Sequence, residues 1–269
     1  MSQFDPAAHP GLTETLTSIT IAAAEAIRRV QADGAVQIKP DGSPVTKADQ
    51  AAEAVIRDGL TRLVPSLPII SEEQEDHDKA PPAGSPYFLV DPLDGTREFI
   101  AGIDEYTVNI AIVANGEPVL GVIAAPAKGI IWRGLVGHGA ERLPFSGRQA
   151  GHPQSIKTRQ RPDGELIAMV SRSHLEARTQ AYLAGFPRTQ RIGCGSSVKF
   201  CRLAEGAADL YPRLAPTHDW DIAAGHAILT AAGGRVIAPD GAPLRYGSPE
   251  LLIPAFLAFG DAGAARPVD

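Results

Sequence analysis

The chain has 269 residues, of which 44% are hydrophobic and 21% charged, and its formal net charge at pH 7 is -6. This length and composition are typical of a globular protein with one large domain or two smaller halves. The negative charge argues against a protein that binds nucleic acid, because such proteins usually present a basic face.

The N-terminal part predicts a long amphipathic helix. Apolar side chains recur at helical spacing over residues 12–30. Threonine, glutamate and arginine residues interrupt this stretch, so it has the pattern of neither a signal peptide nor a membrane span. We therefore expect a cytoplasmic protein.

A hairpin and a second helix are expected next. Residues 36–39 alternate like a short strand, and the turn residues 40–43 reverse its direction. The second helix begins at Thr46 or Asp49 and ends before Pro65. In its first turn, Asp49 would offset the helix dipole by about 0.3 to 1 kcal/mol.

Acidic residues follow the next apolar strand, which we predict at residues 67–70. Glu72 and Glu73 come directly after it. Residues 74–86 are acidic, contain proline and glycine and lack periodicity, which predicts a mobile flap. The acidity of this flap is equally compatible with a solvated surface.

The motif D-P-L-D-G-T is the centre of the chain's acidic chemistry, and a short apolar strand at residues 87–90 precedes it. The proline inside the motif fixes the backbone, so that Asp91 and Asp94 can converge on one point. Gly95 and Thr96 add backbone N–H groups and a hydroxyl. Hard divalent cations prefer carboxylate oxygens, and phosphates prefer such donors. The alternative is a turn whose aspartates only cap backbone N–H groups.

Further strands predict one antiparallel sheet with two helices packed on it. We expect these strands at residues 107–113, 119–125, 130–136 and 139–142. Residues 145–164 are charged and poor in apolar side chains, which is typical of a linker, so we place a domain boundary near Gly151.

Helices and strands alternate after the linker. We expect strands at residues 166–170, 189–192, 208–211 and 235–237, and helices at residues 175–183, 197–205 and 222–232. This alternation predicts an α/β half with helices on both faces of its sheet. Cys194 and Cys201 are interpreted as small buried side chains rather than a disulfide or a zinc site.

Three separated motifs resemble the inositol monophosphatase superfamily of magnesium-dependent, lithium-sensitive phosphatases. They are S-E-E at residues 71–73, D-P-L-D-G-T at 91–96 and W-D-I-A-A-G at 220–225. The stretches 43–49, 96–100 and 195–213 are similar to its CysQ-type 3'(2'),5'-bisphosphate nucleotidase branch. The resemblance runs from about residue 12 to about residue 254 in the expected order.

The resemblance implies an α/β fold, layered as α+β, of the sugar-phosphatase-like αβαβα sandwich type. In this fold an antiparallel-sheet half precedes an α/β half. We therefore assign residues 1–150 to an N-terminal α+β metal-binding half and residues 151–269 to a C-terminal α/β half that determines substrate specificity.

The resemblance also implies a cofactor of two or three Mg²⁺ ions. The implied metal ligands are the carboxylates of Glu72, Asp91, Asp94 and Asp221 and the backbone carbonyl of Leu93. So many converging carboxylates repel one another unless cations lie between them. Asp221 is also expected to open the helix after Trp220, where aspartate is a favoured N-cap, and Asp219 is expected to face solvent.

Hydrolysis is expected to proceed by direct attack of a metal-activated water. The resemblance assigns catalytic roles to Glu72, Asp49 and Thr46, with Asp49 completing the metal site and Thr46 orienting or deprotonating the water. A covalent aspartyl-phosphate is the alternative, but Glu72 and Asp221 favour a two-metal arrangement for in-line displacement.

The resemblance implies substrate contacts from both halves. Gly95 and Thr96 would bind the phosphate that is cleaved, and Lys199 and Arg213 a second phosphate. Further expected contacts with phosphate, ribose or nucleoside are Ser171, Ser173, His174, Ser196, Ser197 and Asp221. The alternative for Lys199 and Arg213 is that they are solvated surface charges, and the alternative for His174 is that it is an exposed loop residue.

We thus expect a cytoplasmic phosphoric monoester hydrolase of sulfur assimilation. Its substrate would be adenosine 3',5'-bisphosphate, from which it would remove the 3'-phosphate. 3'-Phosphoadenylyl sulfate is a further candidate substrate. An inositol monophosphatase or fructose-1,6-bisphosphatase with the same metal site is the alternative, and a non-catalytic regulatory binder the more distant one. The partners expected are a small phosphorylated molecule and, by resemblance, a second copy in a homodimer, but no nucleic acid and no membrane.

Overall fold

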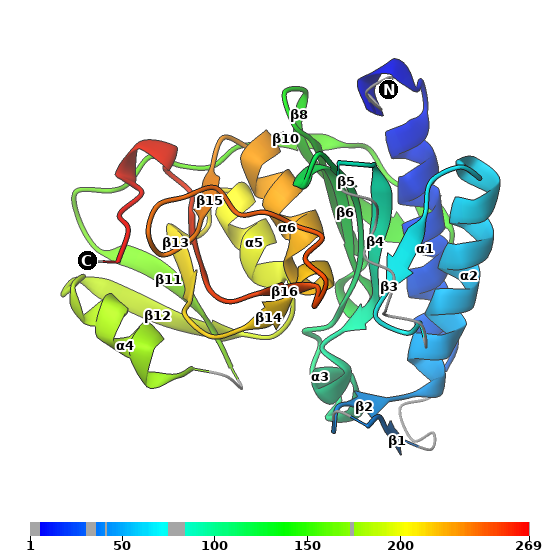
Figure 1. Ribbon diagram of the computed structural model, residues 1–269, viewed down its shortest axis with the longest axis horizontal. Coiled ribbons are helices and arrows are strands. Elements are labelled where there is room, and N and C mark those ends of the chain that lie inside the picture. The colour runs from blue at the N-terminus through cyan, green and yellow to red at the C-terminus, as the bar shows by residue number, and fades with distance from the viewer. Residues whose placement is uncertain (1–5, 31–35, 41, 75–83, 173–174, 269) are drawn as a thin grey trace.

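The computed structural model describes residues 6–30, 36–40, 42–74, 84–172 and 175–268. Five layers follow one another across the molecule in Figure 1, with two long helices on the right, a large sheet, two central helices, a second sheet and a last helix on the left. This order corresponds to the αβαβα sandwich expected from the sequence. The predicted flap, residues 74–86, lies mostly outside the described residues.

The two outer helices on the right are α1 (Leu12–Arg29) and α2 (Lys47–Leu63). Their apolar stripes pack on one face of the large sheet, as the periodicity predicted. The short strands β1 (Gln37–Ile38) and β2 (Pro44–Val45) form the expected hairpin between them.

The large sheet has the strand order β10-β8-β7-β6-β5-β4-β3, and β9 pairs with β8. Its strands are β3 (Ile69–Ser71), β4 (Tyr87–Asp94), β5 (Thr107–Ala114), β6 (Glu117–Ala125), β7 (Ile130–Leu135), β8 (Gly139–Ser146), β9 (Gln149–Ala150) and β10 (Gln154–Ile156). All pairs are antiparallel except β3 with β4, which is parallel. The expected linker at residues 145–164 therefore contains two short strands, and β10 extends the first sheet beyond Gly151.

The second sheet is mixed, with the order β12-β11-β13-β17-β15. Its strands are β11 (Leu166–Ser171), β12 (Thr189–Cys194), β13 (Leu210–Arg213), β15 (Arg235–Ile237) and β17 (Phe256–Phe259). Helix α4 (Ala177–Ala184) lies on its outer face, while α5 (Val198–Ala204) and α6 (Asp219–Ala231) lie between the two sheets (Figure 1). Strands β14 (Thr217–His218) and β16 (Leu252–Ile253) form a separate pair.

Helix α6 lies directly against the first sheet although it belongs to the second half of the chain. A Cβ atom on Gly121 of β6 would overlap the backbone carbonyl of Ala224, and one on Gly134 of β7 would lie 2.8 Å from the Cα of Ile228. These two glycines therefore let the helix backbone approach the strands closely. The core between the sheets contains residues of both halves.

Both cysteines are free and buried, which confirms the interpretation that they are small core side chains. Among the described residues, no helix has the length and apolar character needed to cross a membrane.

Candidate active site

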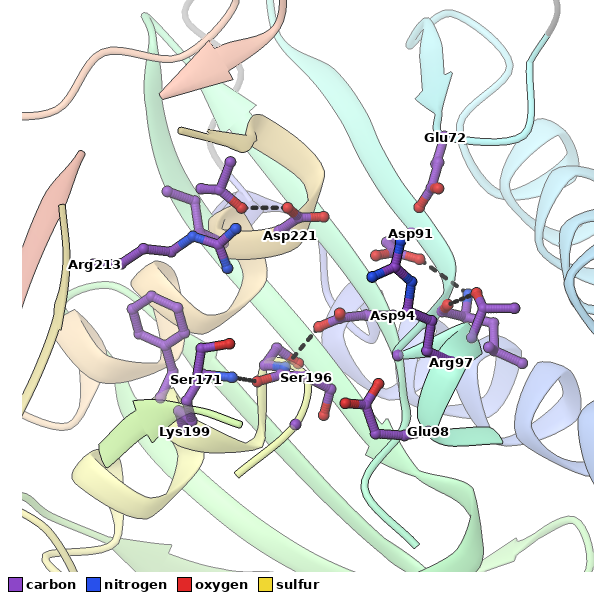
Figure 2. Close-up of a pocket in the computed structure, with 18 of the residues that line it drawn as sticks. Glu72, Asp91, Asp94, Arg97, Glu98, Ser171, Ser196, Lys199, Arg213 and Asp221 are labelled. Atoms are coloured by element: carbon purple, nitrogen blue, oxygen red, sulfur yellow. Dashed lines mark hydrogen bonds between the residues drawn. The ribbon is translucent and has the colours of Figure 1, made fainter. Parts of the chain in front are cut away.

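A cavity of about 250 Å³ opens between the two halves of the chain, and the four carboxylates predicted to bind metal line it (Figure 2). Glu72 follows β3, Asp91 and Asp94 lie in β4, and Asp221 lies in the first turn of α6. Glu72, Asp91 and Asp221 each place a carboxylate oxygen within 4.8 Å of the other two. Four of the predicted metal ligands are thus gathered from three separate elements.

Strand β4 delivers its two aspartates through an irregular stretch. The strand was expected to end before Asp91, but it continues to Asp94, with a shift in its pairing to β5 between these residues. Pro92 lies in the shift, where its missing N–H breaks no ladder hydrogen bond. Leu93 also lines the cavity; its N–H donates to Asp91 at 3.0 Å, and its carbonyl accepts from the Thr96 hydroxyl at 3.1 Å.

The carboxylates hold protons unusually tightly in the absence of cations. Burial, together with the charge of Asp221, raises the pKa of Glu72 and of Asp94 to about 7. Burial and the neighbouring charges of Glu72 and Asp94 raise the pKa of Asp91 well above its ordinary range. Divalent cations would relieve this repulsion, and carboxylate oxygens are the ligands that Mg²⁺ prefers. The donor set therefore fits a magnesium site.

Lys39 supplies a positive charge beside this cluster that the sequence did not reveal. Its Nζ lies 3.0 Å from Glu72 and 2.6 Å from Glu73. The charge of Lys39 partly opposes the rise in the pKa of Glu72 that burial causes. Lys39 follows β1, so the hairpin between the first two helices reaches the acidic cluster.

Asp221 is not the N-cap that was expected. Helix α6 begins at Asp219 with His218 as its N-cap, and Asp221 is the third helical residue, whose Oδ2 accepts from the His218 N–H at 3.1 Å and from the Thr217 hydroxyl. This is the capping-box arrangement, in which the acid at the third position satisfies the cap backbone. Asp219, expected at the surface, is buried and accepts from the Gly247 N–H at 2.7 Å.

Asp49 lies one hydrogen bond behind the cavity, and Thr46 lies two. Thr46 caps α2, and Oδ2 of Asp49 accepts from its N–H at 2.7 Å and from its hydroxyl at 2.6 Å. The other oxygen of Asp49 lies 3.1 Å from the hydroxyl of Thr96, which lines the cavity next to Gly95. Of the predicted catalytic residues, Glu72 lines the cavity itself, whereas Asp49 is connected to it through Thr96, and Thr46 through Asp49.

Ser196 and Ser197 both line the cavity, and the Ser197 side chain also contacts the first sheet. The Ser197 hydroxyl lies 2.7 Å from the Asn109 side chain and 2.9 Å from Thr107, and its N–H donates to Asp94 at 2.6 Å. Ser197 was predicted to bind substrate; it lines the cavity, and its hydroxyl and N–H also make these hydrogen bonds within the protein.

Lys199 lines the cavity but is not a solvated surface charge, since it is only 3% exposed. Its Nζ donates to the carbonyls of Cys194 and Ser196 and lies 5.1 Å from the centre of the Tyr211 ring. These contacts leave its charge close to Asp94, where it lowers the pKa of that carboxyl against the larger effect of burial.

Arg213 ends β13 and points toward Asp221 in Figure 2. One terminal nitrogen donates to the carbonyl of Pro216 at 3.2 Å. Its Nε is buried and, within the part of the chain that the structure describes, has no hydrogen-bond partner. Ser171, at the end of β11, lines the same cavity, whereas Ser173 and His174 lie outside the described residues.

Arg97 and Glu98 also line the cavity (Figure 2), although neither was assigned a role from the sequence. Both belong to the short helix α3 (Thr96–Ile100), directly after the D-P-L-D-G-T motif. Their position in the sequence, directly after Gly95 and Thr96, was the feature from which their place in the cavity could have been predicted.

Comparisons with known proteins agree with the motifs. Residues 11–266 match the Inositol monophosphatase family. A protein of Escherichia coli O157:H7 named 3'(2'),5'-bisphosphate nucleotidase CysQ is 43% identical over 229 residues, which are 83% of this chain and 89% of that protein. The Salmonella typhimurium protein of the same name is 41% identical over 240 residues, 87% of this chain and 94% of that protein.

Solved structures confirm the predicted fold class. The crystal structure of CysQ from Bacteroides thetaiotaomicron, a bacterial member of the inositol monophosphatase family, has a TM-score of 0.77 and 35% identity, covering 92% of this chain and 96% of its own. The inositol monophosphatase from Anabaena has a TM-score of 0.71 and 25% identity, covering 93% of this chain and 90% of its own.

Proposed function

Because the chain belongs to the inositol monophosphatase family, we propose that it is a 3'(2'),5'-bisphosphate nucleotidase that removes the 3'-phosphate of adenosine 3',5'-bisphosphate. 3'-Phosphoadenylyl sulfate, the sulfated precursor, is a second proposed substrate. The observation that carries the proposal is that the clustered carboxylates of Glu72, Asp91 and Asp221 share one cavity with Asp94 and the cation Arg213. Relatives more than 40% identical are named as such nucleotidases.

We propose that two or three Mg²⁺ ions bind at the carboxylates. Glu72, Asp91 and Asp221 would hold cations together, with Asp94 and the carbonyl of Leu93 as neighbouring ligands. When bound, the ions would supply charge neutralisation for the substrate phosphate and activation of water for in-line displacement. The raised pKa values of Glu72 and Asp94 support a site that takes up cations in exchange for protons.

The chain's own residues would then orient the reacting groups. Asp49 accepts hydrogen bonds from Thr46 and lies within hydrogen-bonding distance of Thr96, so it holds the Thr96 hydroxyl at the cavity wall. Asp94 is oriented by the Ser197 N–H. Fixed donors and acceptors of this kind contribute to catalysis because they need no reorganisation during the reaction.

The second phosphate is assigned to Arg213 rather than to Lys199. One terminal nitrogen of Arg213 donates to a single carbonyl, that of Pro216, and its buried Nε has no partner among the described residues, whereas the Lys199 ammonium group donates to two carbonyls. We propose that Lys199 acts on the substrate through its charge and through the loop that it holds. On this proposal residues 1–150 supply most cation ligands, and residues 151–269 select the substrate.

The test is phosphate release in the presence of Mg²⁺ from adenosine 3',5'-bisphosphate, inositol 1-phosphate and fructose 1,6-bisphosphate. We expect kcat/KM for the nucleotide to exceed the other two by about a hundredfold, which corresponds to about 2.7 kcal/mol of transition-state discrimination. A higher kcat/KM for a sugar phosphate would refute the proposed substrate. Of the two proposals, only the cation site would then remain.

A further inference from the structure

Glu105 lies between α3 and β5 and joins the two halves of the chain at the edge of the cavity. Its Oε2 accepts from the Gly195 N–H at 2.7 Å. The guanidinium of Arg172, just after β11, donates to the same oxygen at 3.1 Å through Nε and to Oε1 at 2.8 Å through a terminal nitrogen. We propose that Glu105 is a positioning residue that holds the loop of residues 194–197 in its reactive arrangement. This inference rests on the proposed function.

Two carboxylates from the first half of the chain hold this loop by its backbone. Glu105 accepts from the Gly195 N–H, and Asp94 accepts from the Ser197 N–H at 2.6 Å. Between them, Ser196 has a φ of 49°, in the left-handed region that non-glycine residues rarely adopt. A residue keeps such a conformation only when its surroundings enforce it. The two carboxylates provide that enforcement on either side of Ser196.

The loop also lies too close to the first half to tolerate a side chain at residue 195. A Cβ atom on Gly195 would lie 2.8 Å from the carbonyl oxygen of Glu105 and 2.9 Å from Cγ of Glu98. Only a glycine at residue 195 therefore allows the backbone N–H to lie within hydrogen-bonding distance of the Glu105 carboxylate. A shift of the loop would move Ser196 within the cavity and release Asp94 from its donor.

Arg172 fixes the direction of the Glu105 carboxylate. Besides its hydrogen bonds to Glu105, its guanidinium donates to the carbonyl of Gly193 at 3.1 Å. Burial opposes ionisation of Glu105, but the hydrogen bonds from Arg172 and Gly195 outweigh it, and the pKa of Glu105 lies below its ordinary value. Glu105 therefore remains a charged acceptor for the loop throughout the neutral pH range.

An exposed ion pair contributes little to stability by itself, and Arg172 is 45% exposed. The contact that distinguishes this pair from an ordinary surface pair is the hydrogen bond to Gly195. Loss of Glu105 should consequently affect the reaction much more than the thermal stability.

The experiment compares three variants of the full chain with the wild type. Glu105→Ala removes both contacts. Glu105→Gln can place its amide oxygen at the Oε2 position, where it still accepts from Gly195 and from Nε of Arg172. Glu117→Ala is the matched control, because Glu117 in β6 pairs with Arg245 at 2.8 Å, also links the two halves, and lies outside the cavity lining.

We expect Glu105→Ala to lower kcat/KM at least tenfold on the wild type's best substrate, with Glu105→Gln within about threefold of the wild type. Glu117→Ala should leave kcat/KM unchanged, and both alanine variants should shift Tm equally little. Hydrogen exchange of the amides at residues 195–197 should accelerate only in Glu105→Ala.

The inference is overturned if Glu105→Ala has the same kcat/KM and the same amide exchange as Glu117→Ala. It is also overturned if Glu105→Ala lowers Tm so far that unfolding accounts for the loss of activity. The exchange measurement needs no substrate. A wild type that prefers a sugar phosphate would therefore refute the proposed function while the role of Glu105 is still decided by exchange.

Discussion

Arg213→Met should weaken hydrolysis of a nucleotide bisphosphate specifically. The wild-type side chain reaches the cavity beside Asp221 and keeps its Nε without a partner among the described residues. A hydrogen bond to a charged group contributes about 1.5 to 3 kcal/mol. Loss of one such bond to the second phosphate therefore predicts a decrease in kcat/KM of roughly 10- to 150-fold.

Two substrates that differ only in the second phosphate isolate this contact. The assay measures kcat/KM of wild type and Arg213→Met for adenosine 3',5'-bisphosphate and for adenosine 3'-monophosphate. The variant should lose activity on the bisphosphate and remain within about threefold of wild type on the monophosphate. Arg245→Met, which removes an exposed arginine far from the cavity, should change neither value.

An equal loss on both substrates would refute the assignment. The charge of Arg213 lies near Asp221 and Asp94, so its removal also changes the field at the cation site. That effect would lower hydrolysis of any phosphate and would raise the Mg²⁺ concentration needed for half-maximal activity. A measurement of this concentration for both variants separates the two explanations.

Three further predictions concern the acidic cluster and the elements behind it. Burial raises the pKa of Glu72 and of Asp94 to about 7, so without metal both bind protons more tightly in the folded than in the unfolded chain. The free energy of unfolding of the metal-free protein should then fall as pH rises from about 4 to about 7, and Mg²⁺ should restore it. Thermal unfolding measured across this pH range tests the prediction. A stability that stays constant or rises would contradict the raised pKa values of these carboxylates. Thr46→Ala should cost about 1 kcal/mol of stability through the lost helix cap and lower kcat as well, whereas Thr46→Ser should retain both in urea unfolding and kinetics. Gly121→Ala should destabilise the protein by about 1 to 3 kcal/mol, because the added methyl group would overlap the backbone of α6. Gly164→Ala is the control and should not destabilise the protein, because open space surrounds Gly164. Similar Tm values for the two variants would contradict the close packing of α6 on β6.

Local patterns predicted most of the elements and the acids that gather at the cavity. Glu72, Asp91 and Asp94 follow or end apolar strands, so their delivery to one edge of the sheet could be read from neighbouring residues. The continuation of β4 through Pro92 could not, since proline and aspartate disfavour strands. Pairing with β5, whose Asn109 and Thr107 face Asp91 and Asp94, overrides that preference.

Contacts between distant segments account for the remaining differences. Lys199 is buried because the carbonyls of Cys194 and Ser196 turn toward it, which depends on the left-handed backbone at Ser196. The approach of Glu105 to Gly195 depends on the packing of the two halves. Neither feature leaves a periodic or compositional signal in the chain.

The first sheet depends on segments that are synthesised after most of its strands. Its outer strand β8 is covered by β10, and the apolar face of β5, β6 and β7 is covered by α6, which ends at Ala231. A nascent chain that had emerged only as far as residue 150 would expose both a bare strand edge and a wide apolar surface, the two features that promote association between chains. Ribosome pausing before α6 has emerged should accordingly favour aggregation or chaperone binding, whereas pausing after α6 has emerged should not.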